Sequence, residues 1–117
     1  MFKLRKFEIV ILIGIVLALS SFAYGFFAME QITVSNSVKT LTSATYGTSN
    51  RAFLTLEDAN IRFTYDGVTT PTTAGVGHLL VAGQGFSLED AFQIKNFKAI
   101  RAATTDAKLT VTYQYVE

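Results

Sequence analysis

The stretch AKLTVTYQY, residues 107–115, alternates apolar and polar side chains along its whole length. Successive side chains of a strand point to opposite faces of a sheet, so this period of two predicts a strand with one buried face. The predicted inward side chains are Ala107, Leu109, Val111, Tyr113 and Tyr115, and the predicted outward ones are Lys108, Thr110, Thr112 and Gln114. The end of the chain therefore predicts a β-sheet whose outward face meets solvent or a partner subunit.

Shorter alternating runs precede this strand. Residues 32–34 place Ile32 and Val34 on one face, and residues 61–65 place Ile61, Phe63 and Tyr65 on one face. Turn-forming stretches rich in Gly, Thr, Asp and the single proline separate the runs, as an all-β domain requires. In residues 87–97 the Ser87 to Asp90 spacing of a capping box predicts one short helical turn. The sequence thus predicts a mainly β fold, a small antiparallel β-sandwich of jelly-roll type, over residues 30–117.

The expected core of this sandwich collects the residues of the apolar strand faces and of the continuous apolar runs. These are Phe53, Ile61, Phe63, Leu79, Val81, Ile100, Leu109, Val111 and Tyr113.

An apolar segment without charge, residues 9–29, precedes the predicted sandwich. At about 1.5 Å per helical residue it is long enough to cross a hydrocarbon layer of roughly 30 Å. Lys3, Arg5 and Lys6 precede it, which by the positive-inside rule keeps the N-terminus cytoplasmic and exports the rest. Residues 1–29 are therefore expected to be a retained transmembrane-type helix, whose membrane or assembly contacts are Ile9, Ile13, Val16, Leu19, Phe22 and Phe26.

Two other interpretations of the N-terminus stay open. Residues 3–6, 9–19 and 21–23 fit the basic, apolar and small-x-small parts of a cleaved signal peptide. The apolar run continues past that cleavage site to Met29, which favours retention. A clipped pilin-type stem fits poorly, since Lys6 stands before the cut and Glu8 is only the second residue after it.

Composition excludes several functions. The chain has 117 residues and no cysteine, so residues 30–117 have room for a single small domain that folds without disulfides. Their charges nearly balance, with Lys or Arg at seven positions and Asp or Glu at eight, so the basic surface of a nucleic-acid-binding protein is missing.

The residues that could perform chemistry do not form a recognised pattern. His78 is the single histidine and has no Cys, His or carboxylate neighbour at metal-binding or catalytic spacing. The acidic pairs at 57–58 and 89–90 stand where turns are expected, and the glycines of residues 75–85 lack the Lys-Ser/Thr of a phosphate-binding loop. The sequence predicts no catalytic, cofactor or metal site, no small-molecule substrate and no enzymatic activity.

The soluble part, with VKTLTSATY, RAFLTLEDANIRFTYDG, PTT, GHLLVAGQ, FKAIRA and AKLTVTY in order, resembles a class of small bacteriophage virion structural β-sandwich proteins. The resemblance is one of general pattern over residues 30–117. It implies a packing or decoration unit of a capsid, neck or tail, with no catalytic residues. The apolar N-terminal segment is not part of that pattern, and it favours a virion that contains a membrane or a cell-surface assembly.

The sequence therefore predicts a structural subunit, a membrane-anchored virion protein that links or decorates a protein shell. The alternative is a subunit of an extracellular pilus-like filament whose N-terminal helix packs in the filament core. The expected partners are a lipid bilayer, copies of the same chain and other structural subunits, without nucleic acid. The expected interface residues are Thr110, Thr112, Tyr113 and Tyr115, together with the loop of residues 69–77.

Overall fold

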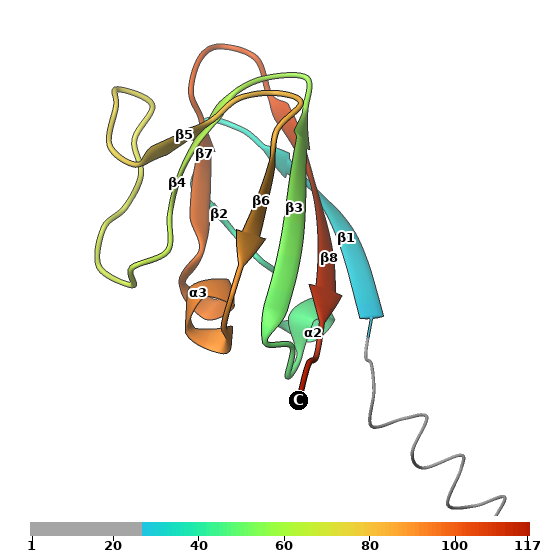
Figure 1. Cartoon of the computed structure of the whole chain (residues 1–117). Coiled ribbons are helices and arrows are strands. Elements are labelled where there is room, and N and C mark those ends of the chain that lie inside the picture. Colours follow the sequence, from blue (N-terminus) through green and yellow to red (C-terminus); the bar gives the residue numbers. More distant parts are fainter. Residues whose placement is uncertain (1–26) are drawn as a thin grey trace, which may run out of the picture.

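A computed structural model describes residues 27–117 of the chain (Figure 1). These residues are mainly β, and the helices among them are short. In chain order the elements are β1 Phe27–Val34, β2 Lys39–Thr40, α2 Ser43–Tyr46, β3 Arg51–Glu57, β4 Ile61–Thr64, β5 His78–Leu80, β6 Gly85–Leu88, α3 Ala91–Asn96, β7 Lys98–Arg101 and β8 Ala107–Gln114.

The strands form two antiparallel sheets that face each other. One has the order β1-β8-β3-β6 and is called the β8 sheet below, and the other, the β7 sheet, has the order β2-β7-β4-β5. The pairs are nested, because β1 pairs with β8, β2 with β7, β3 with β6 and β4 with β5. The described chain is therefore one long antiparallel hairpin, wound so that its arms alternate between two sheets. This is the connectivity of a jelly roll.

The core lies between the sheets and follows the alternation of the strands. In β8 the side chains of Ala107, Leu109, Val111 and Tyr113 are buried, as the period of two predicts. Six predicted core residues are confirmed: Ile61, Phe63, Ile100, Leu109, Val111 and Tyr113. The remaining core side chains are Val34, Leu41, Ala52, Leu54, Leu56, Leu80, Leu88, Ile94, Phe97, Ala99 and Ala107.

For three residues the prediction of a core position is wrong. Phe53 is 53% exposed, Leu79 is 47% exposed and Val81 is 40% exposed. Phe53 lies on the outer side of β3, because the buried positions of that strand are its even-numbered neighbours. In β5 the buried residue is Leu80, which pairs with Ile61, so Leu79 points outward. Val81 follows the end of β5.

Strand β1 begins three residues before the domain boundary expected from the sequence. Phe27, Ala28 and Met29 pair with Gln114, Tyr113 and Thr112 of β8, so they belong to the sheet and not to a helix. The predicted helix positions Ile9, Ile13, Val16, Leu19, Phe22 and Phe26 lie outside the described residues. Between residues 27 and 117, no helix has the length and apolar character needed to cross a membrane.

The predicted helical turn is present as α3, with a different N-cap. The Asp90 side chain accepts a hydrogen bond from the backbone N–H of Gln93, and the Gln93 side-chain oxygen accepts one from the N–H of Glu89. The first bond satisfies a backbone N–H in the first turn of α3, which the helix leaves unpaired, and the second ties the Gln93 side chain to the residue before the N-cap. Ser87, the expected cap, lies in β6.

Both ends of the described chain leave the sandwich at the same end. Phe27, the first residue of β1, pairs with Gln114, the last residue of β8 (Figure 1). We call this the terminal end of the sandwich. Residues 27 and 114, where the described strands begin and end, therefore lie side by side.

We predict that Phe63→Ala lowers the free energy of unfolding by about 3–5 kcal/mol, because it leaves a cavity where the Phe63 ring contacts several other aromatic rings. Phe53→Ala is the matched control and should change it by about 0.5 kcal/mol or less, since that ring is mostly exposed. Denaturant titration of both variants measures this. Equal losses would show that the inward and outward faces are assigned incorrectly.

Candidate interaction surfaces

The outward side of the β8 sheet carries apolar and uncharged polar side chains at its centre. The register of the strands aligns Met29, Thr112, Phe53 and Ser87 in one row across all four strands. We call this side the outer face and define it by Phe27, Met29, Gln31, Thr33, Phe53, Thr55, Thr110 and Thr112.

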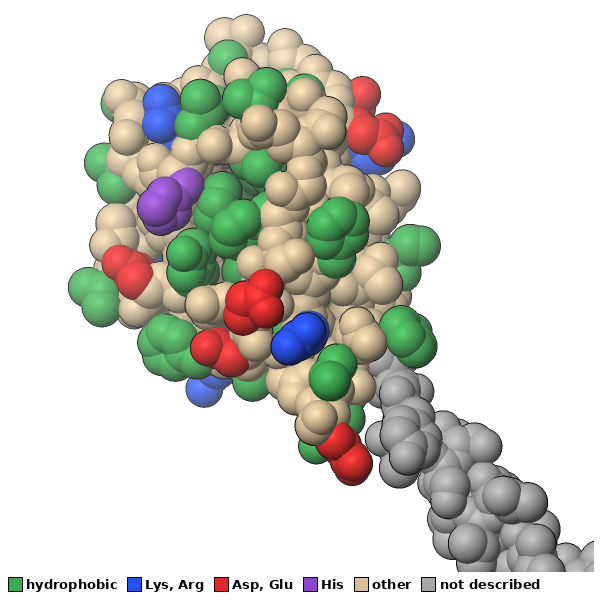
Figure 2. All heavy atoms as spheres, viewed as in Figure 1, with side chains coloured by type: hydrophobic (Ala, Val, Ile, Leu, Met, Phe, Trp, Pro, Cys, Tyr) green, Lys and Arg blue, Asp and Glu red, His purple; other side chains and the backbone are tan. Residues whose placement is uncertain are grey.

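Large hydrophobic side chains stand on the outer face. Phe27 is 67% exposed and Met29 is 63% exposed, and both lie on β1. Lys108 and Glu57 pair at one end of the sheet, and Arg51 stands at the other. Figure 2 shows this side, with hydrophobic side chains set among uncharged ones and charged side chains gathered toward its ends. Aromatic and Met side chains, few charges at the centre and a polar rim are typical of protein interfaces.

The predicted interface residues divide between two environments. Thr110 and Thr112 lie on the outer face as expected, partly buried between neighbouring strands. Tyr113 does not, because it points inward and is fully buried, so its inclusion in an interface was wrong. Tyr115 follows β8 at the terminal end and is 38% exposed, so the prediction that it points inward with Tyr113 is wrong.

Strand β1 is the longest open edge of the two sheets. It pairs with β8 on one side, and no other strand of residues 27–117 pairs with its other side. The remaining edge strands are short: β6 has 4 residues, β5 has 3 and β2 has 2, against 8 in β1. The sequence of β1 has no proline and no lysine, the residues with which natural edge strands commonly avoid further pairing.

A hydrogen-bond network closes the terminal end from inside. The Tyr113 hydroxyl donates to Glu30 Oε2 at 2.9 Å, and the Thr42 hydroxyl donates to Glu30 Oε1 at 2.7 Å. Glu30 therefore ties β1 to β8 and to the residue before α2. The sequence pattern did not predict that Glu30 joins these elements, although the alternation that places Ile32 and Val34 inward also places Glu30 inward.

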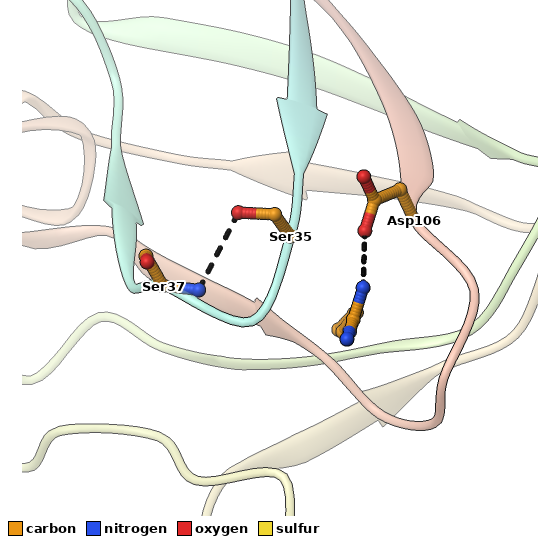
Figure 3. A network of polar contacts seen from close by, with 4 residues as sticks. Ser35, Ser37 and Asp106 are labelled. Carbon is orange, nitrogen blue, oxygen red and sulfur yellow. Dashed lines mark hydrogen bonds and ion pairs between the residues drawn. The ribbon is translucent and has the colours of Figure 1, made fainter.

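The opposite end is held by loop contacts. The Arg101 Nη1 donates to Asp106 Oδ1 at 2.6 Å, and the Ser37 N–H donates to Ser35 Oγ at 3.4 Å (Figure 3). The backbone N–H of Arg101 also donates to the Ser35 carbonyl at 3.0 Å. The turn after β1 and the loop before β8 are thereby joined. The ion pair is partly exposed, so its contribution is about 1 kcal/mol or less.

Two hollows open on the described surface. One, of about 170 Å³, is lined by Arg51, Ala52, Phe53, Ser87, Leu88, Glu89, Thr112 and Gln114 beside the outer face. The other, of about 440 Å³, is lined by Thr64, Tyr65, Asp66, Thr69, Gly77 and His78. The second contains the sole histidine, at the start of β5.

The acidic pairs lie at turns: Glu57 is the last residue of β3 and Asp58 follows it, and Glu89 and Asp90 stand between β6 and α3. Asp90 caps α3, and Asp58 occupies the turn after β3 with a φ of 77°, in the left-handed region. Within residues 27–117, no three His, Cys, Asp or Glu side chains gather in a way that could hold a metal ion.

Comparison of the chain with known proteins identifies no family and finds a structural similarity. No protein-family model matches the chain, and no curated protein matches it. A solved structure described as a member of a family of disulfide-linked pili, the endospore appendages of Bacillus, is similar at 14% identity with a TM-score of 0.45. That similarity covers 79% of this chain and 86% of the other. The sequence of the present chain contains no cysteine.

We predict that Tyr113 makes stability fall with rising pH above about 10. Burial, and next the Glu30 carboxylate, raise the pKa of Tyr113 above its ordinary value of 10.0. The folded chain then holds this proton more tightly than the unfolded chain, so unfolding releases a proton and is favoured as pH rises. Denaturant titrations below and above pH 10 should show a smaller fall for Tyr113→Phe. Tyr115→Phe, at a partly exposed position, is the control, and an unchanged fall in Tyr113→Phe would contradict the prediction.

Proposed function

We propose that the chain is a non-enzymatic structural subunit of an extracellular filament, in which copies of the sandwich pair through their sheet edges. The observation that carries this proposal is the open edge of β1 next to the apolar side chains of Phe27 and Met29. An edge strand presents unpaired N–H and C=O groups along its length, and another strand that pairs with it satisfies them.

The directions of the strands favour a contact that repeats. All neighbours in the β8 sheet are antiparallel, so β1 and β3 run one way and β8 and β6 run the other. If two copies have the same orientation, β6 of one copy meets β1 of the next in antiparallel direction. Such a head-to-tail contact uses two different surfaces, and it produces a filament when the rotation between successive copies does not close a ring.

Apolar side chains beside the open edge of β1 would be buried in the same contact between copies. Phe27 and Met29 alternate with the inward side chains of β1, so they project from the outer face close to the open edge. A neighbouring copy at that edge would cover part of both side chains. Apolar area buried in this way contributes about 25 cal/mol per Å². This adds to the limited stability of a domain of this size without disulfides.

The position of the N-terminal segment agrees with an assembly role. Residues 1–26 join the domain at the first residue of β1, beside the open edge. The uncharged run of residues 9–26 is apolar enough to pack in the interior of an assembly. The cations at positions 3, 5 and 6 favour export of the sandwich.

The second candidate is a membrane-anchored virion structural protein, as the resemblance to bacteriophage structural proteins implies. The specific observation in its favour is the same run of residues 9–26, which falls within the length that spans a bilayer. Detergent distinguishes the two candidates. A membrane anchor should be solubilised as a small unit, whereas a filament held by strand pairing should remain a polymer.

We predict that Gln31→Lys with Thr33→Lys shortens or abolishes the polymer in detergent. Both residues are exposed on β1, and two added cations on an edge strand oppose pairing with another copy. Electron microscopy and sedimentation of the full chain measure polymer length.

The matched control places lysines at Thr110 and Thr112 of the neighbouring strand β8, on the same outer face. That variant changes the charge of the face without altering the edge, so its polymers should keep most of their length. Normal polymers from the β1 variant, or a loss restricted to the β8 variant, would rule out pairing through the edge.

A further inference from the structure

The hollow of about 440 Å³ lies between the loop that follows β4 and the first residue of β5. Tyr65 and Asp66 begin that loop, and Gly77 and His78 end it. The strand-pairing proposal uses the β8 sheet, whereas this hollow is built on the β7 sheet. We call it the loop pocket. Its volume falls within the range of about 300–1,000 Å³ that small ligands occupy.

One side of the loop pocket is aromatic. The rings of Tyr65 and His78 stack with their centroids 5.8 Å apart and an angle of 25° between their planes. The buried ring of Phe63 supports both, at 6.1 Å from Tyr65 and 5.3 Å from His78. Phe86 of the β8 sheet does not line the pocket, but its ring centroid lies 5.8 Å from that of Tyr65. In Figure 2 the histidine lies at the surface with hydrophobic side chains beside it.

The other side presents a fixed carboxylate. Asp66 Oδ1 accepts hydrogen bonds from the backbone N–H groups of Val68 at 3.0 Å and Thr69 at 2.8 Å, and Oδ2 accepts one from the Thr69 hydroxyl at 2.6 Å. The bonds from Thr69 and then Val68 lower the pKa of Asp66 to about 2. The carboxylate is therefore ionised and oriented at neutral pH. A carboxylate can accept about four hydrogen bonds, so Asp66 keeps capacity for a donor from a ligand.

The loop that carries these groups is held in one conformation. Gly77 has a φ of 109°, and a Cβ at this position would stand 2.9 Å from the Phe63 carbonyl oxygen. The Thr64 hydroxyl donates to the Thr69 carbonyl at 2.7 Å. The Thr72 N–H donates to the Val76 carbonyl at 3.0 Å, which closes the far part of the loop. A pocket that is already ordered costs little conformational entropy when a ligand binds.

We propose that the loop pocket binds a pyranose ring of a carbohydrate. A pyranose has a face of C–H groups, which carry partial positive charge and pack against the negative face of an aromatic ring. Its hydroxyl groups are hydrogen-bond donors that suit Asp66, and charge assistance strengthens such bonds.

Other ligand classes fit the pocket less well. An anionic ligand is repelled by Asp66. No further acidic side chain lines the pocket to complete a cation site. A plain aromatic ligand leaves the carboxylate without a donor.

The test is saturation-transfer-difference NMR on the full chain with glucose, galactose and N-acetylglucosamine, each also as a β-1,4-linked oligosaccharide. The method observes the small ligand, so it works on a large assembly, and any detergent used must lack a sugar headgroup. The proposal expects transfer to the ring C–H protons of at least one sugar at millimolar concentration. Transfer to the monosaccharide and the oligosaccharide alike identifies a site that also accepts a polysaccharide, and transfer to the monosaccharide alone identifies a free sugar as the ligand.

Two variants connect any signal to the pocket. Asp66→Asn keeps the side-chain oxygen that caps Val68 and Thr69 but removes the charge, and His78→Gln removes the exposed ring. Each should weaken the transfer at least threefold, whereas Asp106→Asn, in the loop before β8, should leave it unchanged. No transfer to any of the three sugars, or equal transfer in both pocket variants, overturns the proposal.

Discussion

Strand β8 pairs with β1 on one side and with β3 on the other, and the rest of the fold depends on this double pairing. It joins the first and last strands of the described chain, so the pairs between them are nested inside the loop that it closes. Each face of β8 then has a separate role. Leu109, Val111 and Tyr113 fill the core, and Thr110 and Thr112 form the middle of the outer face.

The same pairing determines which groups stay free. Because β8 takes the centre of its sheet, β1 becomes an edge along its full length and carries Phe27 and Met29 to that edge. The Tyr113 hydroxyl bonds to Glu30 across the β1-β8 pair, so the terminal end is closed by a specific contact and not by apolar packing alone. The open edge of β1 beside Phe27 and Met29 is the basis of the proposed assembly.

Sequence patterns predicted the strands whose two faces differ in polarity. Residues 107–113 alternate strictly, and their inward residues were predicted correctly. In β3 the apolar residues Ala52, Phe53 and Leu54 are consecutive, so the alternation does not tell which of them point inward. The same ambiguity affects Leu79 and Leu80, which are chemically identical neighbours. Residues 27–29 continue the apolar run before them, and only their pairing with β8 shows that they belong to a strand.

The candidate sites depended on contacts that a local pattern does not contain. The edge position of β1 follows from the order of the strands, which is set by pairing between distant parts of the chain. His78 has no chemical neighbour in its own stretch of sequence. The loop after β4 returns Tyr65 and Asp66 to its side, and β6 brings Phe86 from the other sheet. A capping role for Asp90 was closer to prediction, because it depends on residues three positions apart.

Hydrogen exchange of the β1 backbone in the native assembly tests the central claim most directly. The N–H groups of β1 that point away from β8 are exposed to water in an isolated domain and are bonded to another strand in a filament joined at this edge. Strand pairing at this edge predicts slow exchange, in the intact assembly, of the outward N–H groups of β1 that lie opposite β6 of the next copy, a strand of 4 residues. It also predicts fast exchange at alternate positions after the assembly is dispersed, while the amides of β8 stay protected in both states. Fast exchange at every outward-pointing N–H of β1 in the intact assembly would contradict strand pairing at this edge.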